Sequence, residues 1–328
     1  MKTIASYPDT RDLHRYLNRR ASRSNDAVKE VTVTPVANPG SYFSARIAVE
    51  YRGGRSERLF FKDLSHSYKS KNDITARRDR EIHVYRDILE DLDLGTAALV
   101  DIHNDDPNGR CWLFLEDLTG TIIQDANDDL GFLAASWLAA LQGSFLDRAE
   151  QLVSDEHLVQ HNAAFFAAPV ENALGQVRDR APSSGAQLSE ICSTYEKVVD
   201  LLAGQPRTFV HGGFIPWHVI VDTATSPPRV SAIDWELAAA GSPLYDLAYF
   251  SHWANPQAQE RMYAAYRTAA VANGVIVPSD TDMRQILAAV KLYRTIAWLA
   301  QSAAQNYSAT KVAKLVRRAA RLSHAARA

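Results

Sequence analysis

The hydrophobic pattern changes once along the chain, near Asp117, and this change restricts the fold more than any other feature of the sequence. Before it, short stretches alternate apolar and polar residues and are separated by turn residues, which is typical of half-buried strands. After it, long stretches are rich in Ala, Leu and Gln, as helices are. Strands followed by helices favour an α+β fold. We therefore predict two domains, residues 1–117 and residues 118–328.

A small antiparallel sheet is predicted in the N-terminal domain. The short connections between successive strands favour hairpins over crossovers. The five predicted strands are residues 28–36, 44–51, 57–64, 97–104 and 110–118. Two helices accompany them, at residues 10–22 and 73–91, and the second carries an apolar face made of Ile82, Tyr85, Ile88 and Leu89.

The C-terminal domain is predicted to be mainly helical. Helices are expected at residues 127–147 and 156–204, with a break near residues 182–185, and again from the end of a hairpin to the end of the chain. One hairpin interrupts them, at residues 218–222 and 229–235. The last helix, residues 311–328, is basic and amphipathic, which is compatible with a membrane surface or an acidic partner but more often marks an ordinary surface helix.

Composition excludes several classes of protein. The formal net charge of -2 gives no global attraction to nucleic acid or to an anionic membrane. Cys111 and Cys192 are far apart, which argues against a disulfide framework and a cysteine zinc site. No apolar run approaches the ~18 residues of a membrane span, and the first residues lack the apolar core of a signal peptide. We expect a cytoplasmic protein that binds neither nucleic acid nor membrane.

The strongest local signal is the segment FVHGGFIPWHVIVD, residues 209–222, followed by AIDWE, residues 232–236. A short strand leads into His211, a turn follows, and a hairpin then ends in a carboxylate. In kinases this arrangement places a catalytic loop beside a metal-binding Asp. The order of these features therefore favours phosphoryl transfer.

These motifs resemble those of the aminoglycoside phosphotransferases and their choline kinase and sugar kinase relatives. The first segment is similar to the family's HGDxxxxN catalytic loop, and AIDWE is similar to its metal-binding IDWE. The resemblance implies a two-lobed, protein-kinase-like fold and a site for ATP or GTP with Mg²⁺ in a cleft between the lobes. It also implies that Asp234 binds the metal and that Asp246, in GSPLYDLAYF, is a structural carboxylate that holds the catalytic loop.

The resemblance extends to the nucleotide-binding lobe. Lys62 matches the third-strand lysine that contacts nucleotide phosphates, and Glu81 matches the helix glutamate that pairs with it. Glu116 and Asp117 match the hinge whose backbone receives the adenine ring. Gly40 and Ser41 lie in the loop from Asn38 to Ser44 that would cover the phosphates, although this loop has one glycine rather than a glycine-rich run.

Glu236 has two interpretations. It follows Asp234 by two residues, so on a continued strand both would share one face. It would then assist the metal, or it would bind a neighbouring basic group.

Two positions depart from the family pattern. The catalytic Asp is replaced by Gly213, which has no side chain to accept a proton, and the metal-binding Asn is replaced by His218. Mg²⁺ prefers oxygen ligands, so an imidazole weakens its site or favours another metal. A further hypothesis is that His211 or His218 has taken over proton transfer, although the family uses the histidine at position 211 to brace the loop.

Three functions remain open at this point. The first is a phosphotransferase that acts on a hydroxyl of a small molecule or peptide. The second is a pseudokinase, which binds nucleotide or a partner protein without transfer, and the third is nucleotidyl transfer. Three acidic residues after the hinge would suit a cationic acceptor, but such charges more often stabilise a helix N-terminus: Asp125, Asp128 and Asp129.

Overall fold

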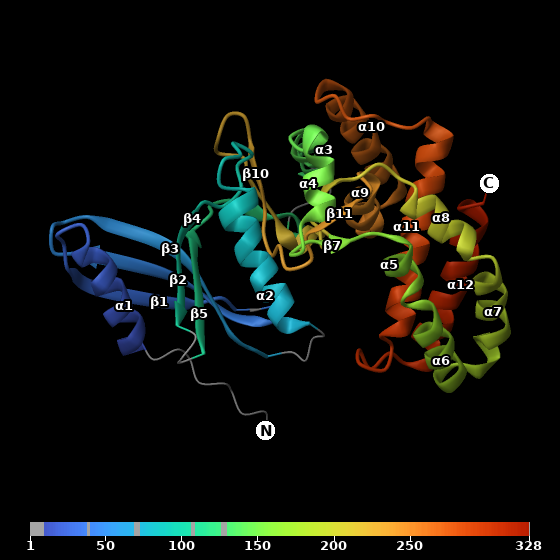
Figure 1. Cartoon of the computed structure of the whole chain (residues 1–328), viewed down its shortest axis with the longest axis horizontal. Coiled ribbons are helices and arrows are strands. Elements are labelled where there is room, and N and C mark those ends of the chain that lie inside the picture. The colour runs from blue at the N-terminus through green and yellow to red at the C-terminus, as the bar shows by residue number, and fades with distance from the viewer. Residues whose placement is uncertain (1–9, 38–39, 69–72, 106–108, 126–129, 328) are drawn as a thin grey trace. The chain divides into compact units, whose positions relative to one another are not determined.

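The computed structural model describes residues 10–37, 40–68, 73–105, 109–125 and 130–327. The chain divides into two compact units, Met1–Gly120 and Thr121–Ala328 (Figure 1). The first unit contains a sheet with two helices, and the second contains the remaining helices and several short strands.

A five-stranded antiparallel sheet forms the body of the first unit. Its strands lie in the order β1-β2-β3-β5-β4, and each neighbouring pair is antiparallel. The strands are β1 (Val28–Pro35), β2 (Tyr42–Tyr51), β3 (Ser56–Ser67), β4 (Leu99–Asp105) and β5 (Arg110–Glu116). The predicted antiparallel sheet is confirmed, with small differences at the ends of its strands.

Helix α1 (Thr10–Ser22) covers an apolar face of this sheet. Its buried residues recur every four positions, so they form one stripe along the helix. This stripe joins a hydrophobic cluster that includes Ile47 and Phe61 of the sheet. The buried residues of the stripe are Leu13, Leu17 and Ala21.

The second helix of this unit changes its winding along its length. It begins as α2 (Ile74–His83) and continues as a π-helical turn, η1 (Val84–Ile88). Of the predicted apolar face, Ile82 is only half-buried, and Glu81 takes a buried position instead. The buried face of α2 therefore includes a carboxylate, which requires a partner.

The second unit contains more helices than the two long predicted stretches suggest. The predicted helix at 127–147 is α3 (Gly131–Gly143), and the stretch 156–204 is divided among several shorter elements. The other α-helices of the described chain in this unit are α4 (Ala149–Ser154), α5 (Ala163–Ala167), α6 (Val170–Arg180), α7 (Gly185–Ser193), α8 (Glu196–Ala203), α9 (Leu244–Phe250), α10 (Pro256–Ala272), α11 (Asp280–Ala300) and α12 (Ala309–Ala325).

Helix α11 lies at the centre of the helical packing. It contacts α6, α9 and α12, while α3 packs against α10 (Figure 1). Helix α12 buries the stripe Val312, Val316 and Ala319 and leaves most of its basic residues at least partly exposed. Since α12 packs against α11 and α7 within the same unit and its stripe is buried, its apolar face is already covered, as in an ordinary surface helix.

The predicted hairpin of the second unit is confirmed, but the expectation that it is alone was wrong. Strands β9 (Val219–Asp222) and β10 (Arg229–Ala232) pair as predicted, and β6 (Thr121–Ile122) joins them. A second sheet places β11 (Ala239–Gly241) between β8 (Thr208–Val210) and β7 (Val159–Gln160). These added strands have two or three residues each, too few to show an alternating pattern in the sequence.

Candidate active site

A buried ion pair occupies the centre of the first unit's sheet. Lys62 lies on β3, which is flanked by β2 and β5, and its Nζ atom is 2.7 Å from both carboxylate oxygens of Glu81 on α2. The side chains are 11% and 1% exposed. Two charges so far from water are tolerated because each compensates the other. The structure thus brings together the lysine and glutamate that the sequence pairs.

The two predicted hinge residues secure the end of the same sheet. The Asp117 carboxylate is 3% exposed and contacts the guanidinium groups of Arg46 at 2.9 Å and Arg58 at 2.8 Å. The backbone N–H of Glu116 donates to the carbonyl of Ala98 at 2.9 Å. The Asp117 carboxylate therefore forms ion pairs with two strands of the sheet. A nucleotide would contact Asp117 through its backbone.

The predicted phosphate-covering loop is only partly described, since residues 38 and 39 lie outside the described chain. Gly40 is exposed, and a Cβ atom there would meet no atom within 4 Å. The Ser41 carbonyl accepts hydrogen bonds from the backbone of Tyr68 at 2.8 Å and the hydroxyl of Ser67 at 3.1 Å. Ser41 thus joins the start of β2 to the end of β3, and the space around Gly40 does not demand a glycine.

In the second unit, a loop follows β8 and leads into the short 3-10 helix η7 (Pro216–His218). Gly212 has a φ of +74°, and a Cβ atom there would lie 2.0 Å from the carbonyl oxygen of Leu237. Only glycine fits this position. Gly213 differs, because its Cβ would make ordinary contacts, the nearest at 3.5 Å with Leu237.

Asp246 holds this loop from helix α9. Its carboxylate is fully buried and accepts hydrogen bonds from the backbone N–H groups of His211 at 2.6 Å and Gly212 at 3.0 Å. Burial raises the pKa of Asp246 to about 7, and backbone donors, including the N–H of Phe214, oppose the rise. Asp246 therefore lies where the resemblance expects a structural carboxylate.

His211 braces the loop from inside. The carbonyl of Ile233 can only accept, so Nε2 of His211 donates to it at 3.0 Å, while Nδ1 accepts from the backbone N–H of Gly213 at 3.2 Å. The ring is fully buried, and burial lowers its pKa to about 3. With both nitrogens engaged, His211 does not have the geometry of a general base.

His218 faces Asp234. Its Nδ1 lies 2.9 Å from the carbonyl oxygen of Gly213, and its Nε2 lies 3.5 Å from Oδ2 of Asp234. Both side chains are about one quarter exposed, at 26% and 29%. The two residues at the predicted metal-binding positions are thus neighbours, one with a nitrogen and one with an oxygen.

The expected strand face shared by Asp234 and Glu236 does not exist. Strand β10 ends at Ala232, and Asp234 has a left-handed backbone with a φ of +68°. The alternation of a strand therefore stops before these carboxylates. Glu236 is 7% exposed, and its carboxylate does not share a strand face with that of Asp234.

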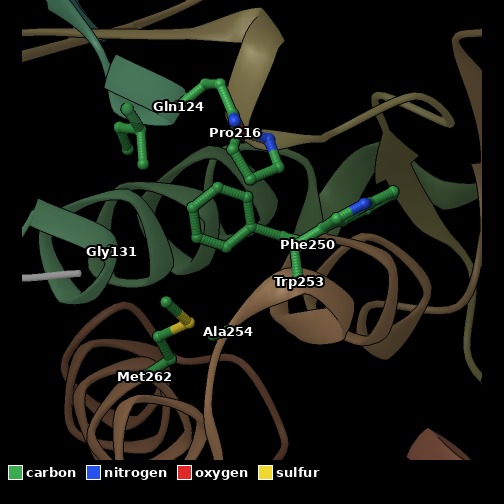
Figure 2. A pocket seen from close by; sticks show the side chains of 8 residues that line it. Gln124, Gly131, Pro216, Phe250, Trp253, Ala254 and Met262 are labelled. Carbon is green, nitrogen blue, oxygen red and sulfur yellow. The ribbon is translucent and has the colours of Figure 1, made fainter. Parts of the chain in front are cut away.

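A cavity of about 210 Å³ lies beside the loop, and its aromatic lining was not foreseen from the sequence. Figure 2 shows the rings of Phe250, Trp253 and Pro216 around it, with Met262 on another side. Trp217, next to Pro216, packs edge-on against Trp253 at 5.4 Å. The aromatic run that follows Asp246 was the available signal, but its direction depends on how α9 packs. Ile123, Gln124, Gly131 and Ala254 complete the lining.

The acidic residues that follow the hinge cannot be placed in this cavity. Residues 126–129 lie outside the described chain, and only the backbone of Asp125 is described, within the 3-10 helix Ile123–Asp125. The expectations for Asp125, Asp128 and Asp129 therefore stay predictions.

No helix in the described ranges is long and apolar enough to cross a membrane. No curated protein sequence matched the chain.

Solved structures share the fold at low sequence identity. A variant of aminoglycoside 2′-phosphotransferase-IIIa in complex with GDP matches with a TM-score of 0.65 and 15% identity, over 94% of this chain and 96% of its own. A putative aminoglycoside phosphotransferase from Ralstonia eutropha matches with a TM-score of 0.59 and 14% identity, over 97% of both chains. A macrolide 2′-phosphotransferase from Brachybacterium faecium matches with a TM-score of 0.59 and 16% identity, over 93% of this chain and 98% of its own.

These likenesses confirm the predicted protein-kinase-like α+β fold. The profile of the phosphotransferase enzyme family matches residues 43–279, which is most of the chain and contains the buried ion pair, the braced loop and the His218–Asp234 pair. The chain therefore belongs to the phosphotransferase enzyme family.

Proposed function

We propose that this protein transfers a phosphoryl group from ATP or GTP to a hydroxyl group of a small molecule or peptide. The observation that carries this proposal is the buried pair of Lys62 and Glu81. Burying two charges costs free energy that a pair of apolar residues would avoid. The pair has a use if the Lys62 ammonium neutralises the phosphates of a nucleotide while Glu81 fixes its position.

The acceptor is proposed to occupy the cavity beside Pro216. The cavity is next to the braced loop, where the family places its catalytic residues, and the described side chains around it are mostly apolar or aromatic. An acceptor with both apolar and polar groups would fit such a lining, which also includes Gln124. Loop residues held by Asp246 would keep the hydroxyl in a fixed position, which is a large part of catalysis in phosphoryl transfer.

Position 213 lowers the expected rate. A general base contributes about 10²–10⁴ in rate, and Gly213 offers none. His211 has both nitrogens in hydrogen bonds. His218 has its Nδ1 bonded to the Gly213 carbonyl and its Nε2 directed at Asp234, on the side of the predicted metal. We therefore propose that transfer depends on positioning and charge neutralisation. The proton of the acceptor hydroxyl would pass to a basic group of the substrate or to water.

The predicted Mg²⁺ does not fit the donor atoms at the expected metal positions. Mg²⁺ is bound by oxygen in near-octahedral sites, whereas His218 places an imidazole nitrogen beside the Asp234 carboxylate. No step of the proposed reaction is assigned to Mg²⁺ for this reason.

A pseudokinase is the second candidate, and Gly213 favours it, because the position of the catalytic carboxylate has no side chain. In this case Lys62 and Glu81 would bind a nucleotide for a regulatory or scaffolding purpose. The two candidates agree on nucleotide binding and differ on turnover.

A comparison of the wild type with Gly213→Asp and Gly213→Ala tests the proposal. The space at Gly213 accommodates a Cβ atom, so both variants should fold. Binding of ATP and GTP is measured by calorimetry with several divalent ions, and slow hydrolysis or transfer is followed with a labelled γ-phosphate. Slow wild-type turnover that rises about 10²-fold or more in the Asp variant, and not in the Ala variant, supports the phosphotransferase.

The other outcomes separate the alternatives. Nucleotide binding with turnover only in Gly213→Asp would favour the pseudokinase. Absence of nucleotide binding in the wild type would contradict both candidates.

A further inference from the structure

The loop decides which nitrogen of His218 is available. The backbone carbonyl of Gly213 can only accept a hydrogen bond, so the Nδ1 atom at 2.9 Å must carry the hydrogen. In a neutral imidazole the other nitrogen, Nε2, then holds a lone pair. Histidines that bind metals commonly have their second nitrogen bonded to a backbone carbonyl in this way.

That lone pair faces a carboxylate at a distance suited to sharing an ion. Nε2 of His218 and Oδ2 of Asp234 are 3.5 Å apart. Neighbouring ligands of one ion, with bonds of about 2.1 Å, lie about 3.0–3.4 Å apart. A small movement of either side chain would place both atoms in one coordination sphere.

The surroundings keep the two ligands in place. Asp234 holds a positive φ of +68°, a conformation that costs free energy in a residue with a side chain and persists only where the structure enforces it. The bond from His218 ends on Gly213, which is itself held by the ring of His211. The pair is therefore part of a braced structure rather than two free surface residues.

We propose that His218 and Asp234 bind a divalent first-row transition ion, with Mn²⁺ as the representative, in preference to Mg²⁺. A nitrogen donor raises affinity for such ions and adds little for Mg²⁺, while Mn²⁺ also accepts carboxylate and phosphate oxygens. The inference rests on the proposed function in one respect, because oxygens of the bound nucleotide complete the coordination. It differs from the family resemblance, which implies Mg²⁺ bound by Asn and Asp.

The test measures binding and coordination rather than turnover. The full chain is titrated with Mn²⁺ and with Mg²⁺ in the presence of the β,γ-methylene analogue of ATP, whose bridge contains no nitrogen. The variant His218→Asn is compared, since its amide can still donate to the Gly213 carbonyl and is the residue that the family carries. His324→Asn, an exposed position on α12, is the matched control.

We expect His218→Asn to weaken Mn²⁺ binding by about tenfold or more while Mg²⁺ binding stays equal or improves. His324→Asn should change neither. Pulsed electron paramagnetic resonance of the Mn²⁺ complex should show a histidine nitrogen coupling that changes when the chain is labelled with ¹⁵N-histidine, and this coupling should vanish only in His218→Asn.

Equal Mn²⁺ affinity in the wild type and His218→Asn, or a Mn²⁺ complex without histidine coupling, would overturn the inference. The experiment also distinguishes a failure of this inference from a failure of the proposed function. Histidine-coordinated Mn²⁺ with no turnover under any condition supports the metal site and contradicts transfer, whereas turnover with Mg²⁺ and no histidine coupling does the reverse.

Discussion

The carboxylate of Asp246 accepts a 2.6 Å hydrogen bond from the backbone N–H of His211, which lies 35 residues earlier in the chain. A second bond from Gly212 uses the other oxygen of the same carboxylate. Helix α9 thereby determines the path of the loop that follows β8. The buried side chain of Asp246, which lies outside the loop in sequence, therefore fixes the loop that would position an acceptor.

Replacing Asp246 by Ala should remove this control. The backbone N–H groups of His211, Gly212 and Phe214 would lose their partner, and each unpaired donor costs about 1–3 kcal/mol, so we expect a loss of about 3 kcal/mol or more in the free energy of unfolding. Urea denaturation measures the loss. Asp200→Ala, at an exposed position on α8, should change little, and equal stability of the two variants would contradict the role of Asp246 in holding the loop.

Lys62→Met should destabilise the first unit, because it leaves the Glu81 carboxylate buried without its partner. Breaking a buried pair costs about 3–5 kcal/mol, whereas replacing both charges by apolar groups is often neutral. The double variant Lys62→Met with Glu81→Leu should therefore recover most of the stability. Calorimetry should show that nucleotide binding is lost in both variants. A double variant that is stable and still binds nucleotide with wild-type affinity would contradict the proposed contact of Lys62 with the nucleotide phosphates.

Gly212→Ala and Gly213→Ala form a matched pair that separates two neighbouring glycines. At 212 the added methyl group would collide with the Leu237 carbonyl at 2.0 Å, and the φ of +74° is unfavourable for alanine. We expect a loss of about 2 kcal/mol or more at 212 and less than about 1 kcal/mol at 213. Thermal unfolding of both variants checks this. Similar melting temperatures would mean that the loop shifts to admit the methyl group.

Acid should weaken the second unit through His161. This ring is fully buried between Phe165 and Tyr245, and burial, with Arg207 and Arg294 nearby, lowers its pKa to about 3. The unfolded chain binds the proton near the ordinary value of 6.5. Between these values the unfolded state holds more protons, so stability falls as the pH falls below about 6.5.

His161→Phe removes this titration and keeps an aromatic ring in place. Urea denaturation between pH 7.5 and 5.5 should show a pH slope that is smaller by up to about 1.4 kcal/mol per pH unit. His324→Gln, at an exposed position, should leave the slope as it is. An unchanged slope in His161→Phe would show that this ring does not titrate as its burial suggests.

Much of the fold could be predicted because it depends on local patterns. Alternation of apolar and polar residues identified the five strands of the first unit, and the four-residue spacing of Leu13, Leu17 and Ala21 matches the buried face of α1. The pairing of Lys62 with Glu81 was expected from the resemblance to the family rather than from local patterns. The strands and the buried face of α1 need only the period of an element.

Other features were decided by contacts between residues distant in the chain. The sequence offers no reason for Gly212 to approach Leu237, for β7 to pair with β11, or for the Asp234 backbone to turn left-handed after β10. Such contacts arise when separate elements pack, and a strand of two or three residues forms only because a partner is already in place. The sequence alone therefore determined the elements and the order of the motifs. Only the tertiary structure decided that His218 directs its Nε2 at Asp234, because that direction depends on a hydrogen bond to a backbone carbonyl of a folded loop.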